Sequence, residues 1–168
     1  MADRDAFLRW CCANPYAEEV REAYLHWLVL HALELEPKPG QVRHEQPWRD
    51  QLIALRDLTL ALSSAAYIQH PEQQEPQSIS FKLWAFQADY QVLGLLEGST
   101  PQSLQGLDLF DATQWRFWVV PSRDLHPDRR SIGLNPLRRS QGEGLVYGEL
   151  PAHLERLWQE KTPSCDGV

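Results

Sequence analysis

The segment Leu52-Ile-Ala-Leu-Arg-Asp-Leu-Thr-Leu-Ala-Leu-Ser-Ser-Ala-Ala-Tyr-Ile-Gln69 decides the fold of this chain. Two short apolar runs, Leu52 to Leu55 and Leu58 to Leu62, are separated by the charged pair Arg56 and Asp57. This pattern predicts two strands joined by a tight turn. The leucines of the second run alternate with small residues, so one face of that strand is predicted to be apolar and the other small and nearly uncharged.

Helices are predicted before and after this hairpin. Asn14-Pro15 is typical of a helix start, and Val20, Tyr24, Trp27 and His31 recur at helical spacing, which predicts an amphipathic helix to about residue 35 with Trp27 facing the core. The remaining predicted elements are a first helix over 3–13, strands over 79–84, 89–96, 115–120 and 131–134, and a closing helix over 150–161.

These elements predict one α/β domain over residues 1–168, with a mixed, partly antiparallel central sheet of about five strands flanked by helices. The helical N-terminal part covers 1–36, and 162–168 are expected to form a flexible tail. With 168 residues and 43% apolar residues, the chain is long and apolar enough to bury a core of its own.

The charge of the chain is acidic, with a formal net charge of −7 at pH 7. Its long-range field therefore repels polyanions, and nucleic-acid binding requires a locally basic face. One segment fits that requirement, because it holds five arginines against two aspartates: Arg123, Arg129, Arg130, Arg138 and Arg139. Guanidinium groups bind phosphate in bidentate fashion, although a solvated face or an interface with an acidic partner is the alternative interpretation.

A cytoplasmic location is expected, since the charged N-terminus lacks the apolar core of a secretory signal and three cysteines form no even framework. The most apolar stretch, Tyr24 to Leu35, is too short to span a membrane. No metal site is expected, because the chain has no paired-cysteine zinc spacing and no second histidine after His44-Glu45.

Short segments in a fixed order resemble the bacterial restriction-endonuclease-like, or PD-(D/E)XK, nuclease domains. The segments are Val20 to Val29, Ser64-Ala-Ala-Tyr-Ile-Gln69, Ile79-Ser-Phe81, Ala88-Asp-Tyr90, Trp115-Arg-Phe-Trp-Val-Val-Pro121 and Ser131-Ile-Gly-Leu134. The resemblance covers roughly residues 20 to 140. It implies a site where carboxylates hold Mg²⁺ and a lysine assists the attacking water.

At the positions that the resemblance assigns to catalysis, this chain carries other side chains. Ala61 and Ser63 stand where the family has Glu and Lys, and His26 stands where the preceding helix has Glu. Leu52 matches the metal-binding Asp, with Asp50 as the alternative counterpart. The resemblance therefore implies a degenerate nuclease without a cofactor.

The function expected from this resemblance is a catalytically inactive binding or scaffolding subunit of a bacterial nucleic-acid-processing or defence assembly. Its expected partner is a protein or a second copy of the chain, with nucleic acid as a further candidate. One alternative is an active Mg²⁺-dependent DNA endonuclease with a rearranged site built from Asp50, Asp57 and Lys82. A second alternative is a small interaction protein that homodimerises through an exposed aromatic face.

Overall fold

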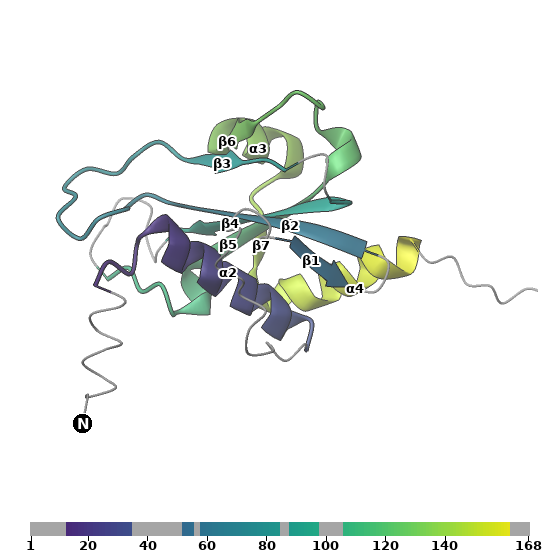
Figure 1. Cartoon of the computed structure of the whole chain (residues 1–168), viewed down its shortest axis with the longest axis horizontal. Helices are drawn as coiled ribbons and strands as arrows, with labels where there is room; N and C mark the ends of the chain where they lie inside the picture. Colours follow the sequence, from purple (N-terminus) through teal and green to yellow (C-terminus); the bar gives the residue numbers. More distant parts are fainter. Residues whose placement is uncertain (1–12, 35–51, 56–57, 85–87, 98–105, 162–168) are drawn as a thin grey trace, which may run out of the picture.

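A five-stranded mixed sheet forms the centre of the protein, with a helical layer on one face and a mixed layer on the other (Figure 1). The computed structural model describes residues 13–34, 52–55, 58–84, 88–97 and 106–161. The helices are α2 (Glu18–Ala32), α3 (Leu134–Gln141) and α4 (Leu150–Lys161), and the strands are β1 (Leu52–Leu55), β2 (Leu58–Ala66), β3 (Ser80–Lys82), β4 (Tyr90–Leu96), β5 (Trp115–Pro121), β6 (Ser131–Gly133) and β7 (Leu145–Val146). The predicted fold class is confirmed.

The predicted hairpin exists as β1 and β2, which pair antiparallel with Leu55 opposite Leu58. β2 runs four residues beyond the predicted apolar run and pairs in parallel with β4. β4 then pairs antiparallel with β5, which in turn pairs antiparallel with the short β7. The main sheet therefore has the order β1-β2-β4-β5-β7 and is mixed, as predicted.

Each face of the sheet is buried under its own layer. On one face, Leu60 and Leu62 of β2 join the apolar side of α2 and of α4 in a single buried cluster. On the other face, Ala65 of β2 joins a cluster that contains residues of β3, β6 and α3. Because successive strand residues point to opposite faces, the leucines of β2 face the helical layer and its alanines at odd positions face the mixed layer.

The approach of α2 to the sheet is close enough to require glycine in β4. A Cβ atom added at Gly94 would lie 2.7 Å from Cδ1 of Leu25 and 3.2 Å from Trp115, which are both fully buried. Overpacking a core in this way is destabilising. The glycine thus allows Leu25 to sit directly on the strand.

Some predicted elements differ from the structure. α2 begins at Glu18 rather than at Asn14-Pro15, because the Asn14 side chain accepts a hydrogen bond from the backbone of Tyr16 and forms a turn before the helix. The predicted strands near 79–84 and 131–134 pair with each other as β3 and β6, in a separate two-stranded sheet. The predicted helix over 3–13 lies outside the described residues.

One α-helix and one strand of the described residues were not predicted from the sequence. α3 follows directly after β6 and places Leu134 and Leu137 in the core of the mixed layer. β7 is two residues long and supplies the fifth strand of the main sheet. Within the described part of the chain, no helix combines the length and the apolar character needed to cross a membrane.

Candidate functional site

The positions that the nuclease resemblance assigns to catalysis lie in the main sheet and in α2. Leu52 and Ala61 are direct partners across the β1–β2 hairpin, and Ala61 is fully buried. Ser63 is 2% exposed and, two residues from Ala61, points to the same face, towards the mixed layer. His26 belongs to α2, which packs on the opposite face, so the structure does not bring His26 together with Ala61 and Ser63.

The residues of the rearranged-site hypothesis can be placed only in part. Asp50 and Asp57 lie outside the described residues. Lys82, at the end of β3, forms an ion pair with Glu18 in the first turn of α2. Across the described ranges, no group of three His, Cys, Asp or Glu side chains could hold a metal ion.

A partly buried carboxylate joins α2 to β2. Oε1 of Glu22 accepts hydrogen bonds from the backbone nitrogen of Ser64, at 2.7 Å, and from its hydroxyl, at 2.9 Å. The other oxygen, Oε2, is buried and has no hydrogen-bond partner. Burial outweighs the two hydrogen bonds and raises the pKa of Glu22 from its ordinary value of 4.5 to about 7.

Arg21, the neighbouring residue, is a buried cation with 2% of its surface exposed. One guanidinium nitrogen donates to the backbone oxygen of Tyr16, whereas Nε is buried without an acceptor. Burial lowers the pKa of Arg21, while Glu22, Glu18 and Glu19 on the same helix act in the opposite direction. An arginine is rarely buried without a direct carboxylate partner, and an unmet buried donor costs about 1–3 kcal/mol.

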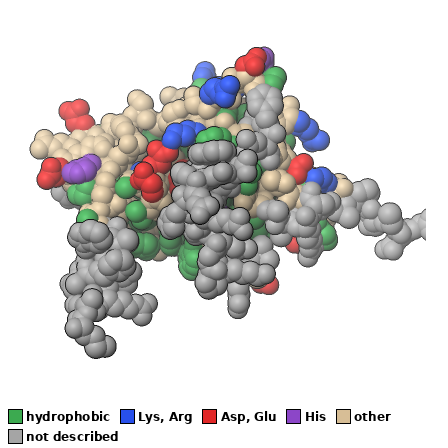
Figure 2. Space-filling view, in the orientation of Figure 1, with side chains coloured by type: hydrophobic (Ala, Val, Ile, Leu, Met, Phe, Trp, Pro, Cys, Tyr) green, Lys and Arg blue, Asp and Glu red, His purple; other side chains and the backbone are tan. Residues whose placement is uncertain are grey.

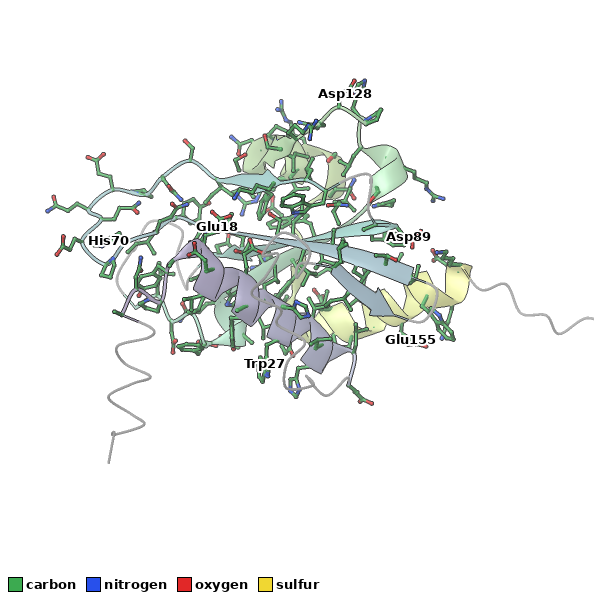
Figure 3. The ribbon with its side chains drawn as sticks, viewed as in Figure 1. Glu18, Trp27, His70, Asp89, Asp128 and Glu155 are labelled. Carbon is green, nitrogen blue, oxygen red and sulfur yellow. The ribbon has the colours of Figure 1, made fainter. Side chains whose placement is uncertain are left out.

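A cavity of about 200 Å³ opens beside Arg21, between the start of α2 and the segment that links β2 to β3. Figure 3 shows Glu18 at this place, on the side of α2 that faces β2 and β3. The cavity lining contains both cations of this region and mainly polar side chains: Glu18, Arg21, Ser64, Gln69, Gln77 and Lys82. Its chemistry is therefore that of a polar binding pocket.

The five arginines of the predicted basic segment have different environments. Arg138 forms an ion pair of 2.7 Å with Glu97 and one of 3.2 Å with Glu143, so its charge is already compensated. Arg123 lies 3.8 Å from Asp124. The others are exposed on the layer of β6 and α3, and we call them the arginine surface: Arg129, Arg130 and Arg139.

The arginine surface is accessible to a partner. Arg129 donates from Nε to the backbone of Ser131, which leaves its terminal nitrogens available, and the described residues provide no ion pair for Arg130 or Arg139. Figure 2 shows basic side chains gathered over the upper part of the molecule, where Figure 1 places β3, β6 and α3. The local charge of this layer is thus opposite to the acidic charge of the whole chain.

No family model, curated protein or solved structure matches the chain. The nuclease resemblance of the short sequence segments therefore remains a hypothesis about function.

An exposed row of rings, which we call the aromatic strip, lies along α2. Trp27 is stacked between Tyr24 and His31, at centroid distances of 5.5 and 5.1 Å, and Tyr24 contacts the edge of Phe110. Trp27 is 42% exposed and Phe110 is 58% exposed. The prediction that Trp27 faces the core is wrong, because the apolar side of α2 is formed by Leu25, Leu28 and Val29 instead.

Sequence reasoning did not place Arg21 or Glu22 in a candidate site, yet their spacing contains the signal. Arg21 precedes Leu25 and Leu28 by four and seven residues, and Glu22 precedes Leu25 and Val29 by three and seven. Residues at these spacings share one helix face. Two charged residues in register with the apolar side of a helix therefore indicate a buried polar site.

Proposed function

We propose that this chain is a non-cleaving binding module, related to restriction-endonuclease-like nucleases, that contacts a nucleic-acid backbone as part of a larger assembly. The observation that supports the loss of cleavage is the strand pair of Leu52 and Ala61. Two apolar side chains face each other where the resemblance places two metal-binding carboxylates. A site without anionic ligands has little to hold Mg²⁺.

The neighbouring position supports the same conclusion. Ser63 is buried in β2 and is neutral, so it supplies no positive charge beside a scissile phosphate. Lys82, the lysine of the rearranged-site hypothesis, forms an ion pair with Glu18 at the cavity beside Arg21. The hydrolytic machinery that the resemblance implies therefore has no counterpart in these side chains.

Binding is supported by the arginine surface. Arginine side chains contact phosphates through charge-assisted hydrogen bonds that position a protein on nucleic acid without reading its sequence. Arg130 and Arg139 are exposed residues of the layer of β6 and α3, and Arg129, which precedes Arg130 in the chain, is exposed as well. In an acidic chain, such a layer directs a polyanion to one face.

Replacing Arg130 and Arg139 together by Gln is expected to weaken duplex DNA binding about tenfold at low salt, because two phosphate contacts are lost. The slope of the logarithm of the association constant against the logarithm of the salt concentration should become less negative by about two, about one unit for each lost phosphate contact. Fluorescence anisotropy with a labelled duplex measures both quantities. The matched control is Arg156→Gln, because Arg156 is an exposed arginine of α4, on the opposite face of the sheet.

The binding proposal fails if wild type and the arginine double variant bind the duplex with equal affinity, or if Arg156→Gln weakens binding as much as the double variant does. If the chain binds an acidic protein through Arg130 and Arg139 but does not bind the duplex, the arginine surface is a binding surface whose ligand is a protein rather than nucleic acid.

The aromatic strip favours a second candidate function, self-association. Trp and Tyr are the residues that most often dominate protein interfaces, and the Trp27 ring is exposed although it is stacked on both sides. Two copies of the strip, related by a twofold axis, would bury each other's rings.

Replacing Trp27 by Ala is expected to raise the dimer dissociation constant at least about tenfold, because truncating a central aromatic residue removes much of an interface's binding free energy. Sedimentation equilibrium over a range of concentrations measures this constant. Phe110→Ala should act in the same direction, whereas Arg156→Gln should have no effect. A wild-type chain that stays monomeric at every concentration rules out this second function.

A further inference from the structure

The cavity beside Arg21 has features that neither the arginine surface nor the lost nuclease site explains. Its lining includes Arg21, a residue that is 2% exposed, and Nε of Arg21 has no acceptor in the part of the chain that the structure describes. Lys82 brings a second cation to the same cavity from β3. The cavity is thus lined by two cations, of which Lys82 is paired with Glu18 and Arg21 has an unmet donor, and this combination suits an anionic ligand.

The chain itself fixes this arrangement. The backbone oxygen of Tyr16 accepts a hydrogen bond from Arg21, and the phenol of Tyr16 donates to the backbone of Leu107 at 3.0 Å. The Asn14 side chain, at the turn before α2, donates to the backbone oxygen of Gln69, a further lining residue, at 3.0 Å. The guanidinium is therefore held in place before any ligand arrives, which lowers the entropic cost of binding.

The charge around the cavity selects the kind of anion. Glu18 lines the cavity, and Glu18, Glu19 and Glu22 all lie within electrostatic range of Arg21. A phosphate monoester carries close to two negative charges at neutral pH, so it would be repelled by these carboxylates. A carboxylate carries one negative charge and matches the planar guanidinium in bidentate geometry.

The remaining lining groups suit a ligand with further polar atoms. Gln77 donates from Nε2 to the backbone of Ala66, so its side-chain oxygen remains able to accept. Ser64 donates its hydroxyl proton to Glu22, so its oxygen is likewise an acceptor. The volume of about 200 Å³ accommodates a molecule of a few non-hydrogen atoms.

We propose that this cavity binds a small polar carboxylate, such as a hydroxy acid or an amino acid, with Arg21 and Lys82 holding the carboxylate. The carboxylate of the ligand replaces Glu18 as the ion-pair partner of Lys82. Glu18 then accepts hydrogen bonds from the donor groups of the ligand. This inference goes beyond the proposed function, since a carboxylate pocket between α2 and β3 stands whether or not the arginine surface binds nucleic acid.

The test titrates acetate, lactate and inorganic phosphate, at constant ionic strength, into the full chain labelled with ¹⁵N. The Arg21 Nε–H signal reports contact with the guanidinium, and the Ser64 and Gln69 amide signals report occupancy of the cavity. Acetate and lactate are expected to shift all three signals and to saturate, with inorganic phosphate binding more weakly than either. No shift of the Arg21 signal, or tighter binding of phosphate than of acetate, overturns the proposal.

Two variants at the cavity should change acetate affinity in opposite directions. Lys82→Gln removes a cation that holds the carboxylate and is expected to weaken binding about fivefold. Glu18→Gln removes a competing carboxylate and is expected to strengthen acetate binding severalfold. Both side chains are partly exposed, so neither change should unfold the protein. Equal affinities in the two variants overturn the assignment, and Arg156→Gln serves as the unaffected control.

Discussion

Replacing Glu22 by Gln is expected to remove a large pH dependence of stability. Burial raises the pKa of this carboxyl from 4.5 to about 7 in the folded protein, so the folded state holds the proton more tightly than the unfolded chain. The stabilisation is complete below about pH 4.5 and is lost as the pH rises through about 7. At about 1.4 kcal/mol per tenfold difference in proton affinity, the loss is about 3 kcal/mol.

Urea unfolding at several pH values between about 4.5 and 8.5 measures this effect. The free energy of unfolding of wild type should fall over that interval by about 3 kcal/mol more than that of Glu22→Gln. Glu155→Gln is the matched control, because Glu155 is exposed on α4, and it should follow wild type. Parallel profiles for wild type and Glu22→Gln would show that the carboxyl has the same pKa in the folded and unfolded states, which would contradict the raised pKa.

The variant Ser64→Ala provides a second test of the raised pKa of Glu22. The hydrogen bonds from Ser64 lower the pKa of Glu22 and partly oppose burial, so removing the hydroxyl should raise that pKa further. The midpoint of the wild-type pH profile is then expected to move to higher pH in Ser64→Ala. A midpoint that moves to lower pH would exclude the hydroxyl as a donor to the carboxylate.

Replacing Gly144 by Ala is expected to destabilise the protein by about 3 kcal/mol or more. Gly144 has φ of +82°, and an added Cβ would lie 2.7 Å from Cε2 of Trp118 and 2.8 Å from the backbone oxygen of Phe117. The chain passes this close to β5 because it must return from α3 to the main sheet as β7. The left-handed backbone and the contact with β5 each add to the cost.

Gly142 provides the matched control, because it has nearly the same φ, +79°, but nothing lies within 4 Å of its added Cβ. Gly142 has ψ of −163°, so Gly142→Ala should cost the backbone contribution alone, about 1–3 kcal/mol, and less than Gly144→Ala. Urea unfolding of both variants separates backbone strain from steric contact. Equal losses in the two variants would mean that the chain before β7 does not pass over Trp118 as closely as the structure indicates.

The parts of the fold that were predicted are those with strong local patterns. The alternation after Arg56-Asp57 identified β2, and the continuous apolar run at 90–96 identified a strand buried on both faces. The spacing of Leu154, Leu157 and Trp158 identified α4. In each case the pattern matches the period of one secondary structure over several residues. Local periodicity is therefore sufficient to predict these three elements.

The parts that were not predicted depend on contacts between distant residues. The pairing of β3 with β6 joins segments about fifty residues apart, and no local pattern separates such a pair from a strand of the main sheet. α3 has eight residues with only Leu134 and Leu137 buried, and Pro136 lies in its first turn, so its apolar period is too short to recognise. β7 is too short for any periodic signal.

The candidate site could likewise be predicted only in part. The identities of Ala61 and Ser63 could be compared with the nuclease pattern from sequence, but their burial and the position of His26 on the other face required the sheet topology. The cavity beside Arg21 could not be predicted, because its walls come from α2, the end of β2 and β3. Only the charged residues within the apolar stripe of α2 pointed towards it.

The measurement that tests the central claim most directly is a cleavage reaction with Mg²⁺ or Mn²⁺ on labelled duplex and single-stranded DNA. It compares wild type with the Asp50→Ala, Lys82→Ala double variant. The account predicts that wild type leaves both DNAs intact while still retaining the duplex through the arginine surface. Metal-dependent cleavage by wild type that is lost in the double variant would contradict it, and would show that the active site has moved within the fold.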